Sequence, residues 1–232
     1  MKIKKVAKLA FACVASLGIV FGAAGSASAA ANEDPSEEFG IAVVVGDELI
    51  RLSEDQVASV TANYDAGSPA DTETNADIAP KLIDFPAWTA CFTFNAEETV
   101  FAEWNFAWNG VLNPVKLKCG NESWGYKHIK AGKETAWQTQ LNKARTYGWD
   151  GASMGVNNWD DLMAIAAGMT ITYPEDVRTR ASANTRCAVA GIYLMKGDVT
   201  LYQFNTRVGF ATNNDRLLTT FPQSSSQCPT TN

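Results

Sequence analysis

The fold is decided at residues 187–221, which read CAVAGIYLMKGDVTLYQFNTRVGFATNNDRLLTTF. Three runs rich in β-branched and aromatic residues are separated by two short polar turns, at 196–198 and 213–215. Turns this short join antiparallel strands, because parallel strands need a much longer crossover. The stretch therefore predicts a three-stranded antiparallel meander, with strands over 187–194, 199–212 and 216–221.

The residues before the meander follow a helical period. Apolar side chains recur at about every fourth residue from Ile129 to Leu141, in a stretch with one glycine and no proline. The same spacing runs from Trp159 to Met169, behind a candidate N-cap at Asn158. We therefore predict an α+β fold, with N-terminal β-hairpins and two central helices packed on a small C-terminal antiparallel sheet.

The hairpins are expected within residues 81–119. Strands are predicted over 91–94, 100–108 and 115–119, because alternating apolar residues there are interrupted by turn-forming residues. The predicted organisation has four parts, which are a signal peptide (1–29), an acidic and partly disordered segment (30–80), a β-hairpin subdomain (81–119) and a ribonuclease-like α+β domain (120–232).

The first 29 residues have the pattern of a secretory signal. Lys2, Lys4, Lys5 and Lys8 precede an apolar run over 9–25, and Ala-x-Ala cleavage sites follow it. We expect a secreted, extracellular bacterial protein that is monomeric. The mature chain lacks any other stretch apolar enough to span a membrane.

Charge is distributed unevenly along the chain, whose formal net charge is −6. Residues 30–80 hold twelve Asp or Glu against one Arg, whereas residues 81–232 hold fourteen Lys or Arg against thirteen Asp or Glu. The tract over 65–75 is polar throughout and predicts a linker, because it cannot bury enough apolar surface to offset its ordering entropy. Whether residues 30–80 form a removable propeptide is left open.

The mature chain keeps four cysteines, Cys91, Cys119, Cys187 and Cys228. An even number in an exported protein predicts two disulfides, for which three connectivities exist. Proximity along the chain favours Cys91–Cys119 and Cys187–Cys228, because short loops close at a modest entropic cost.

Two short motifs carry a resemblance to a known group of folds. Ser123-Trp124-Gly125-Tyr126-Lys127-His128-Ile129 opens the helical region, and the last strand ends Leu217-Leu218-Thr219-Thr220-Phe221-Pro222. Over residues 120–223 this pairing resembles the barnase–EndoU–colicin–RelE group of ribonuclease folds, and also small secreted actinobacterial proteins of unestablished function. The resemblance implies that His128, basic strand residues and Thr219 face one cleft.

Cleavage of RNA by transesterification needs a base, a cation and an acid. The single histidine of the chain, His128, is the candidate base and excludes a two-histidine mechanism. Because the second histidine common in the resembled group is replaced here near Lys133, the acid must be lysine, tyrosine or water. Candidate catalytic residues are His128, Arg207, Lys130 and Thr219, and candidate substrate-binding residues are Lys133, Arg186 and Tyr126.

The leading hypothesis is a secreted ribonuclease-like toxin or antimicrobial protein whose partner is RNA or another polyanion. Net basic stretches over 116–145 and 178–216, inside an acidic chain, favour such a partner. Two alternatives remain open: a non-catalytic protein that binds a cell-wall polymer through its tryptophans, and an antimicrobial proprotein activated by proteolysis. We expect no cofactor and no metal, because no metal-ligand or nucleotide-binding motif occurs.

Overall fold

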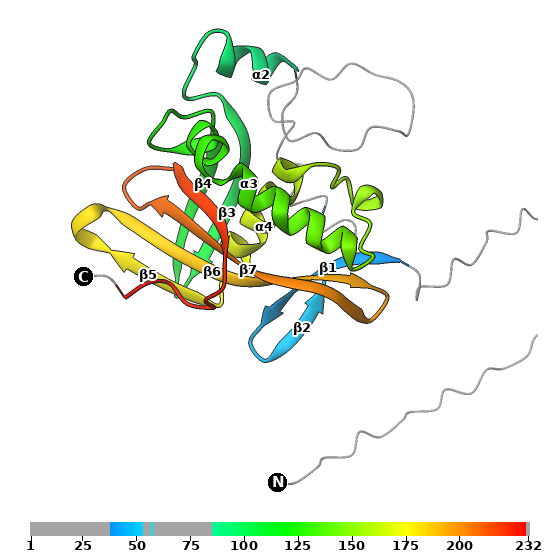
Figure 1. Cartoon of the computed structure of the whole chain (residues 1–232). Coiled ribbons are helices and arrows are strands. Elements are labelled where there is room, and N and C mark those ends of the chain that lie inside the picture. Colours follow the sequence, from blue (N-terminus) through cyan, green and yellow to red (C-terminus); the bar gives the residue numbers. More distant parts are fainter. Residues whose placement is uncertain (1–37, 53–56, 58–84, 231–232) are drawn as a thin grey trace, which may run out of the picture. The chain divides into compact units, whose positions relative to one another are not determined.

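The computed structural model describes residues 38–52, 57 and 85–230 (Figure 1). The predicted signal peptide and the predicted linker lie outside these residues. Among them, six strands form one antiparallel sheet with the path β2-β1-β6-β7-β8, and β5 pairs with β6 beside that path. A separate two-stranded sheet and three α-helices complete the described part. The fold is α+β, as predicted.

The predicted meander forms the centre of the large sheet. It consists of β6 (Thr185–Lys196), β7 (Val199–Ala211) and β8 (Leu217–Gln223). The turn between β6 and β7 contains Gly197 with φ +52°, a left-handed conformation that a hairpin turn favours in glycine. On β7, the alternate residues Phe204, Val208 and Phe210 are buried and face the helices.

The acidic segment contributes strands to this sheet, so a boundary at residue 80 does not separate it from the C-terminal domain. β1 (Phe39–Val45) pairs with the second half of β6, and β2 (Glu48–Arg51) extends the sheet beyond β1. β5 (Asp176–Arg180) pairs with the first half of β6. The long β6 thus has β1 and β5 on one flank and β7 on the other.

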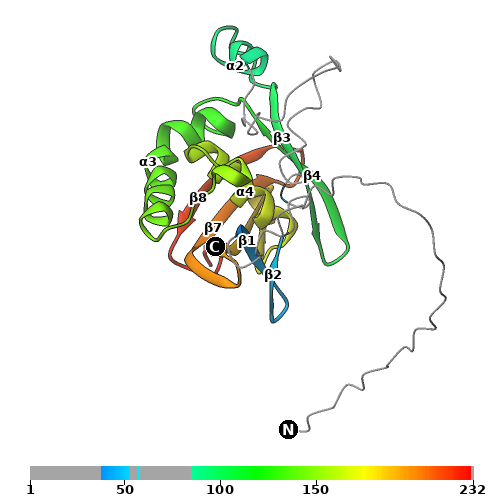
Figure 2. The same cartoon turned by 90° about the vertical axis from the view of Figure 1, so that its right-hand side faces the viewer.

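The two central helices are α3 (Gly125–Thr146) and α4 (Trp159–Thr172), as the periodicity predicts. Asn158 caps α4 through a reciprocal capping box with Asp161. Residues of α4 are buried on all sides because the helix contacts α3, β3 (Val100–Trp108), β6 and β7 (Figure 2). α3 lies along β8 and keeps one polar face exposed.

The predicted strand over 91–94 is wrong, because residues 85–92 form helix α2 (Phe85–Phe92). Pro86 falls in the first turn of α2, where its missing N–H breaks no helical hydrogen bond. The other two predicted strands exist: β3 and β4 (Val111–Lys118) form the separate hairpin. The bond between Cys91 and Cys119 holds α2 beside the end of β4.

Both disulfides have the predicted pairing. Cys91–Cys119 joins α2 to the end of β4, and Cys187–Cys228 joins β6 to the C-terminal tail (residues 224–230). Each bond closes a loop between parts of the chain that share no other regular pairing. The first bond therefore fixes α2 to the β3–β4 hairpin, and the second fixes the C-terminal tail to the large sheet.

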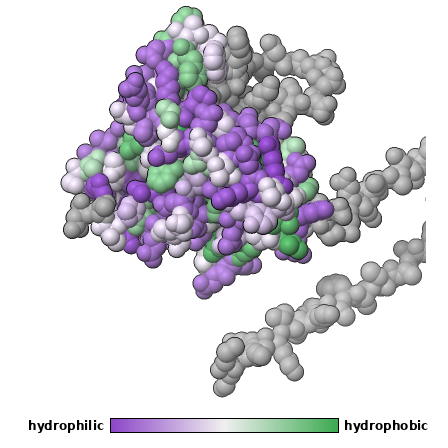
Figure 3. All heavy atoms as spheres, in the orientation of Figure 1, coloured by the Kyte–Doolittle hydropathy of each residue, from purple (hydrophilic) through white to green (hydrophobic). Residues whose placement is uncertain are grey.

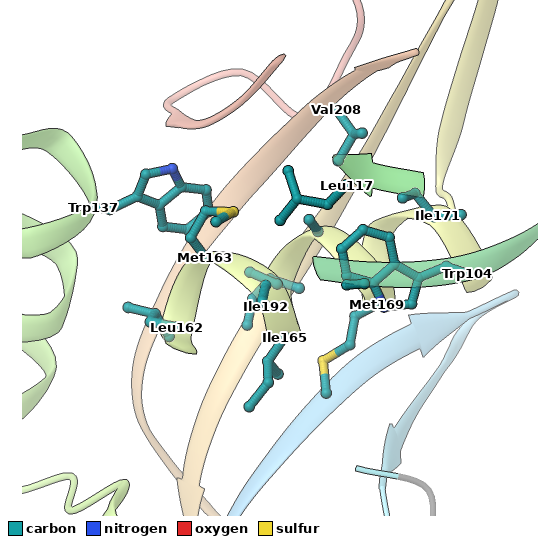
Figure 4. Packing of buried hydrophobic residues seen from close by; sticks show 14 of the residues in the cluster. Trp104, Leu117, Trp137, Leu162, Met163, Ile165, Met169, Ile171, Ile192 and Val208 are labelled. Carbon is teal, nitrogen blue, oxygen red and sulfur yellow. The ribbon is translucent and has the colours of Figure 1, made fainter. Parts of the chain in front are cut away.

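The core lies between the large sheet, the helices and the β3–β4 hairpin. Figure 4 shows Met163 of α4 next to Trp137 of α3, and Met169 next to Trp104 of β3. Five tryptophans are buried in it, namely Trp104, Trp124, Trp137, Trp149 and Trp159. In contrast, the face of the molecule in Figure 3 is mostly hydrophilic.

Candidate anion-binding site

Four arginines line one pocket of about 310 Å³ at the β5 end of the large sheet. We call it the arginine pocket; it is formed by β5, β6, β7, β8 and the C-terminal tail, and its polar lining includes Arg178, Thr179, Arg180, Arg186, Arg207 and Thr219. No acidic residue is among those that line it. Arg178 forms an ion pair with Asp176, with 3.5 Å between Nε and Oδ2.

Strand register explains why one face of the large sheet carries Arg178, Arg180, Arg207 and Thr219. Arg178 lies opposite Cys187 and Arg180 lies opposite Thr185, so the alternation of β5 puts both arginines on one face. On the same face, Gly209 of β7 lies opposite Thr219 of β8. A glycine at this position leaves space above the sheet, which the pocket occupies.

The C-terminal tail supplies one wall of the pocket. Cys228 is held by its bond to Cys187, and its backbone N–H donates to Asp176 Oδ2 at 2.7 Å. Pro229 and Thr230, the next two residues, line the pocket. The disulfide therefore fixes the tail against the arginines.

Three buried polar atoms of the pocket residues lack a hydrogen-bond partner among the described residues. They are Nη1 of Arg186, Nε of Arg207 and Oγ1 of Thr219. Buried donors are normally paired, because an unpaired one costs about 1–3 kcal/mol. Arg207 Nε and Thr219 Oγ1 lie on the face of the sheet that carries Gly209, so a ligand with acceptor oxygens there would satisfy both. Arg186 alternates to the opposite face, where its Nε donates to Thr179 Oγ1 and its guanidinium carbon lies 5.0 Å from the ring centre of Phe106.

The electrostatics of the pocket also favour an anion. Burial and the neighbouring Arg180 lower the pKa of the Arg207 guanidinium, so the positive charge is held against both desolvation and like-charge repulsion. Arg207 Cζ lies 5.4 Å from the ring centre of Phe221, which partly offsets this cost. A bound anion would relieve both effects.

The structure brings together only some of the predicted site residues. Arg207, Arg186 and Thr219 line the arginine pocket. Lys133 lies beside it on α3, with Nζ 4.9 Å from the Phe221 ring that Arg207 also contacts. Phe221 thus connects α3 to the pocket.

His128 and Lys130 are not among the residues that line the pocket. His128 lies half-exposed in the first turn of α3, and its Nδ1 is 2.8 Å from the Glu122 carbonyl oxygen. Because a carbonyl oxygen only accepts, Nδ1 carries the proton of the neutral ring and Nε2 keeps its lone pair. Lys130 pairs with Glu134 at 3.3 Å and lies 5.5 Å from the ring centre of Trp159.

Tyr126 is placed in the core, away from any substrate. It is 4% exposed, packs on Phe101 and Trp159, and donates its hydroxyl proton to Asp160 Oδ2 at 3.0 Å. Burial and the adjacent carboxylate raise its pKa, so the phenol stays neutral. Its chemistry is accordingly that of a buried hydrogen-bond donor.

Sequence reasoning missed Arg178, Arg180 and Thr179. Their signal is the five-residue stretch Asp-Val-Arg-Thr-Arg at 176–180, in which two arginines alternate with threonine. Alternation over so few residues is weak, and β5 is recognisable as a strand only from its pairing with β6.

Metal-ligand groups and membrane-spanning helices are both absent from the described residues. In the part of the chain that the structure describes, no three His, Cys, Asp or Glu residues lie close enough to hold a metal ion together. Within the same residues, no helix is both long and apolar enough to cross a membrane.

Comparisons with known proteins add two relatives. No family model and no solved structure matches the chain. Two uncharacterized proteins of Mycobacterium tuberculosis, from two strains, are each 33% identical to it over 107 residues, which is 46% of this chain. The matched region is 36% of each relative, so the chain spans about a third of the length of the curated relatives it matches.

Proposed function

We propose that the protein binds the phosphate groups of RNA in the arginine pocket and acts as a secreted, ribonuclease-like toxin or antimicrobial protein. The observation that carries the proposal is the pair of buried, unpaired donors on Arg207 and Thr219. They belong to a pocket whose lining, among the described residues, contains four arginines and no acid.

Phosphate suits this donor set better than other anions. Guanidinium groups donate two parallel hydrogen bonds to a phosphate, and a threonine hydroxyl adds a third direction. A phosphodiester keeps one negative charge at neutral pH. A polymer of phosphodiesters engages several cations at once. The charge of the chain is consistent with this role, because the basic residues are concentrated outside its acidic segment.

Cleavage would use the base form of His128. Its Nε2 would take the proton from a ribose 2′-hydroxyl, the 2′-oxygen would form a bond to phosphorus, and the 5′-oxygen would leave with a proton from a lysine or from water. Because His128 does not line the arginine pocket, Arg207 and Thr219 would hold the same RNA strand through a neighbouring phosphate. Lys133, about one turn after His128 on α3, contacts the same Phe221 ring as Arg207, which links the helix of His128 to the pocket.

The binding test uses a fluorescent single-stranded RNA titrated with the oxidised protein at low salt. We expect Arg207→Gln to weaken binding at least 10-fold, and Arg145→Gln to leave it nearly unchanged. Arg145 is a matched control because it is exposed near the far end of α3 and lies outside the pocket. Equal affinity of the two variants would refute binding at the arginine pocket.

The cleavage test compares the wild-type protein with His128→Ala on the same RNA. Loss of cleavage with unchanged RNA affinity and melting temperature is expected if His128 is the base. Absence of cleavage by the wild-type protein, with binding intact, would restrict the function to binding. Secretion is tested separately by the N-terminal sequence of the protein recovered from culture medium, which should begin close to residue 30.

A further inference from the structure

A second pocket, of about 460 Å³, lies further along the same sheet. We call it the amide pocket; it is formed by the second halves of α3 and β6, by β7, and by the end of β8, and its lining includes Gln140, Lys143, Tyr193, Gln203, Asn205 and Gln223. Gly191 forms part of its wall, and a Cβ atom there would come within 3.0 Å of the Tyr193 ring. The missing side chain thus lets the Tyr193 ring lie over Gly191.

Strand register connects the amide pocket to the arginine pocket. Successive cross-strand pairs on one face of β7 and β8 are Gly209–Thr219, Arg207–Phe221 and Asn205–Gln223. The first pair belongs to the arginine pocket, and the last pair belongs to the amide pocket. Arg207 also lines the arginine pocket, so the two pockets meet at the Arg207–Phe221 pair, which lies a step of roughly 7 Å along each strand from either neighbouring pair.

The chemistry of the amide pocket differs from that of the arginine pocket. Among the described residues that line it, Lys143 is the one cation, and the others are amide and phenol residues together with Phe204, Pro222, Gly191 and Ser224. Among the described residues, Asn205 Oδ1 and Gln223 Oε1 accept no hydrogen bond, although the amide nitrogens of both side chains donate to carbonyls of the C-terminal tail. Gln140 accepts a hydrogen bond from Tyr202, which leaves its amide nitrogen to donate.

Tyr193 completes this set of neutral groups. Burial and the nearby Glu175 raise the pKa of its phenol, which therefore keeps its proton and can donate it. Glu175 itself accepts from the Gly191 N–H at 2.7 Å. Neutral donors and acceptors beside aromatic rings are the groups that read the edges of unpaired nucleobases.

We propose that the amide pocket binds the base of a nucleotide adjacent to the phosphate held in the arginine pocket, so that the ligand is single-stranded RNA. A paired base has its Watson–Crick edge occupied, so a duplex does not fit this arrangement. The ring of Phe221 lies between the two sites, beside Arg207 and Lys133. This inference rests on the proposed function, and it adds that base contacts contribute to affinity.

The test uses two tetranucleotide probes with 2′-O-methyl riboses, which the proposed chemistry cannot cleave. One carries four bases and the other is abasic at all four positions, so the two have equal charge. We expect the wild-type protein to bind the base-carrying probe about 10-fold more tightly than the abasic probe, since one well-held base adds stacking and hydrogen bonds that an abasic site lacks. Tyr193→Phe and Asn205→Ala should reduce that ratio toward one without changing the affinity for the abasic probe.

Each outcome decides the proposal. Equal binding of the two probes by the wild-type protein overturns the base site and leaves phosphate binding intact. A ratio that persists in both variants also overturns it, because the bases then bind elsewhere. Failure of the wild-type protein to bind either probe overturns the proposed function together with the base site. Tyr193→Phe removes only a hydroxyl, so it keeps the test valid if Asn205→Ala disturbs the tail.

Discussion

Arg207 and Phe221 face each other across β7 and β8, with the guanidinium carbon 5.4 Å from the ring centre. Lys133 of α3 approaches the same ring at 4.9 Å. One aromatic ring therefore lies beside two cations, and within the described residues neither cation has an ion pair with a carboxylate that would neutralise it. Such an arrangement keeps both positive charges available to an anion, at an energetic cost that the ring partly offsets.

Replacement of this ring should weaken RNA binding. We expect Phe221→Leu to lower affinity by about 2–5-fold, because a cation–π contact at a partly exposed site contributes about 0.5–1 kcal/mol. Phe92→Leu is the matched control, since Phe92 also carries a lysine, Lys127 at 5.7 Å, but lies on α2. Fluorescence anisotropy at fixed salt measures both variants, and equal losses would contradict a specific role for Phe221.

The two disulfides should differ in their effect on binding but not in their effect on stability. Replacing Cys187 and Cys228 by serine, or Cys91 and Cys119 by serine, should each lower the free energy of unfolding by about 2–4 kcal/mol, because the loops span 41 and 28 residues. Only the first pair fixes a wall of the arginine pocket. Urea unfolding and RNA titration would therefore show similar stability losses, with reduced RNA affinity in the Cys187/Cys228 variant alone.

The elements that sequence predicted correctly are those with long, regular periods. The stripe from Ile129 to Leu141 and the alternation along 187–221 each extend over several turns or several residue pairs, so local errors average out. The pairing of four cysteines followed from proximity along the chain. The strand predicted over 91–94 is wrong because Phe92, Thr93 and Phe94 favour strands, whereas tertiary contacts override that preference and α2 extends to Phe92.

The candidate site was only partly accessible from the sequence. Arg207 and Thr219 lie on predicted strands, so their place in one pocket could be anticipated from the meander, whereas Arg186 directly precedes the predicted strand over 187–194. Arg178 and Arg180 lie on β5, which is joined to β6 by residues 181–184 alone, but its five residues are too few for their alternation to identify a strand. The pairing of β1 with β6 cannot be derived from local residue patterns either, because it joins segments that lie far apart in the chain.

These two missed arginines provide a direct test of the pocket. Arg178→Gln and Arg180→Gln should each weaken RNA binding and reduce the slope of log affinity against log salt by about 0.7, as expected when one contact to a single strand is lost. Measurements at four salt concentrations between low and moderate ionic strength give the slope. Unchanged slopes in both variants would show that RNA is bound outside the arginine pocket.

An ion-pair network of Lys118 with Glu98 and Asp215 predicts how the free energy of unfolding depends on pH. Lys118, with its side chain 11% exposed, donates to Glu98 at 2.8 Å and to Asp215 at 2.7 Å, which ties the β3–β4 hairpin to the turn before β8. The hydrogen bonds to Lys118 and Arg216 lower the pKa of Glu98. Burial would raise the pKa of Asp215, but the hydrogen bond from Lys118 outweighs burial, so the pKa is lowered. Burial would lower the pKa of Lys118, but the hydrogen bonds to Asp215 and Glu98 outweigh burial, so the pKa is raised.

Because the folded pKa values of Glu98 and Asp215 lie below their ordinary values of 4.5 and 3.8, their stabilisation is present above those values. It is lost as the pH falls through the lowered folded pKa values. The stabilisation from Lys118 is complete below its ordinary value of 10.5 and is lost as the pH rises through the raised folded pKa. We therefore expect a stability plateau between about pH 5 and pH 10 from this network.

Asp215→Asn should lower the free energy of unfolding on that plateau by about 1–2 kcal/mol, because it leaves the buried Lys118 with one carboxylate partner instead of two. It should also make the acid side of the stability curve shallower. Glu134→Gln is the control, since its pair with Lys130 is exposed and contributes about 0.3–0.5 kcal/mol. Urea unfolding at intervals of half a pH unit from pH 3 to pH 7 measures both variants, and an acid slope in Asp215→Asn as steep as in the wild-type protein would mean that other carboxylates govern acid unfolding.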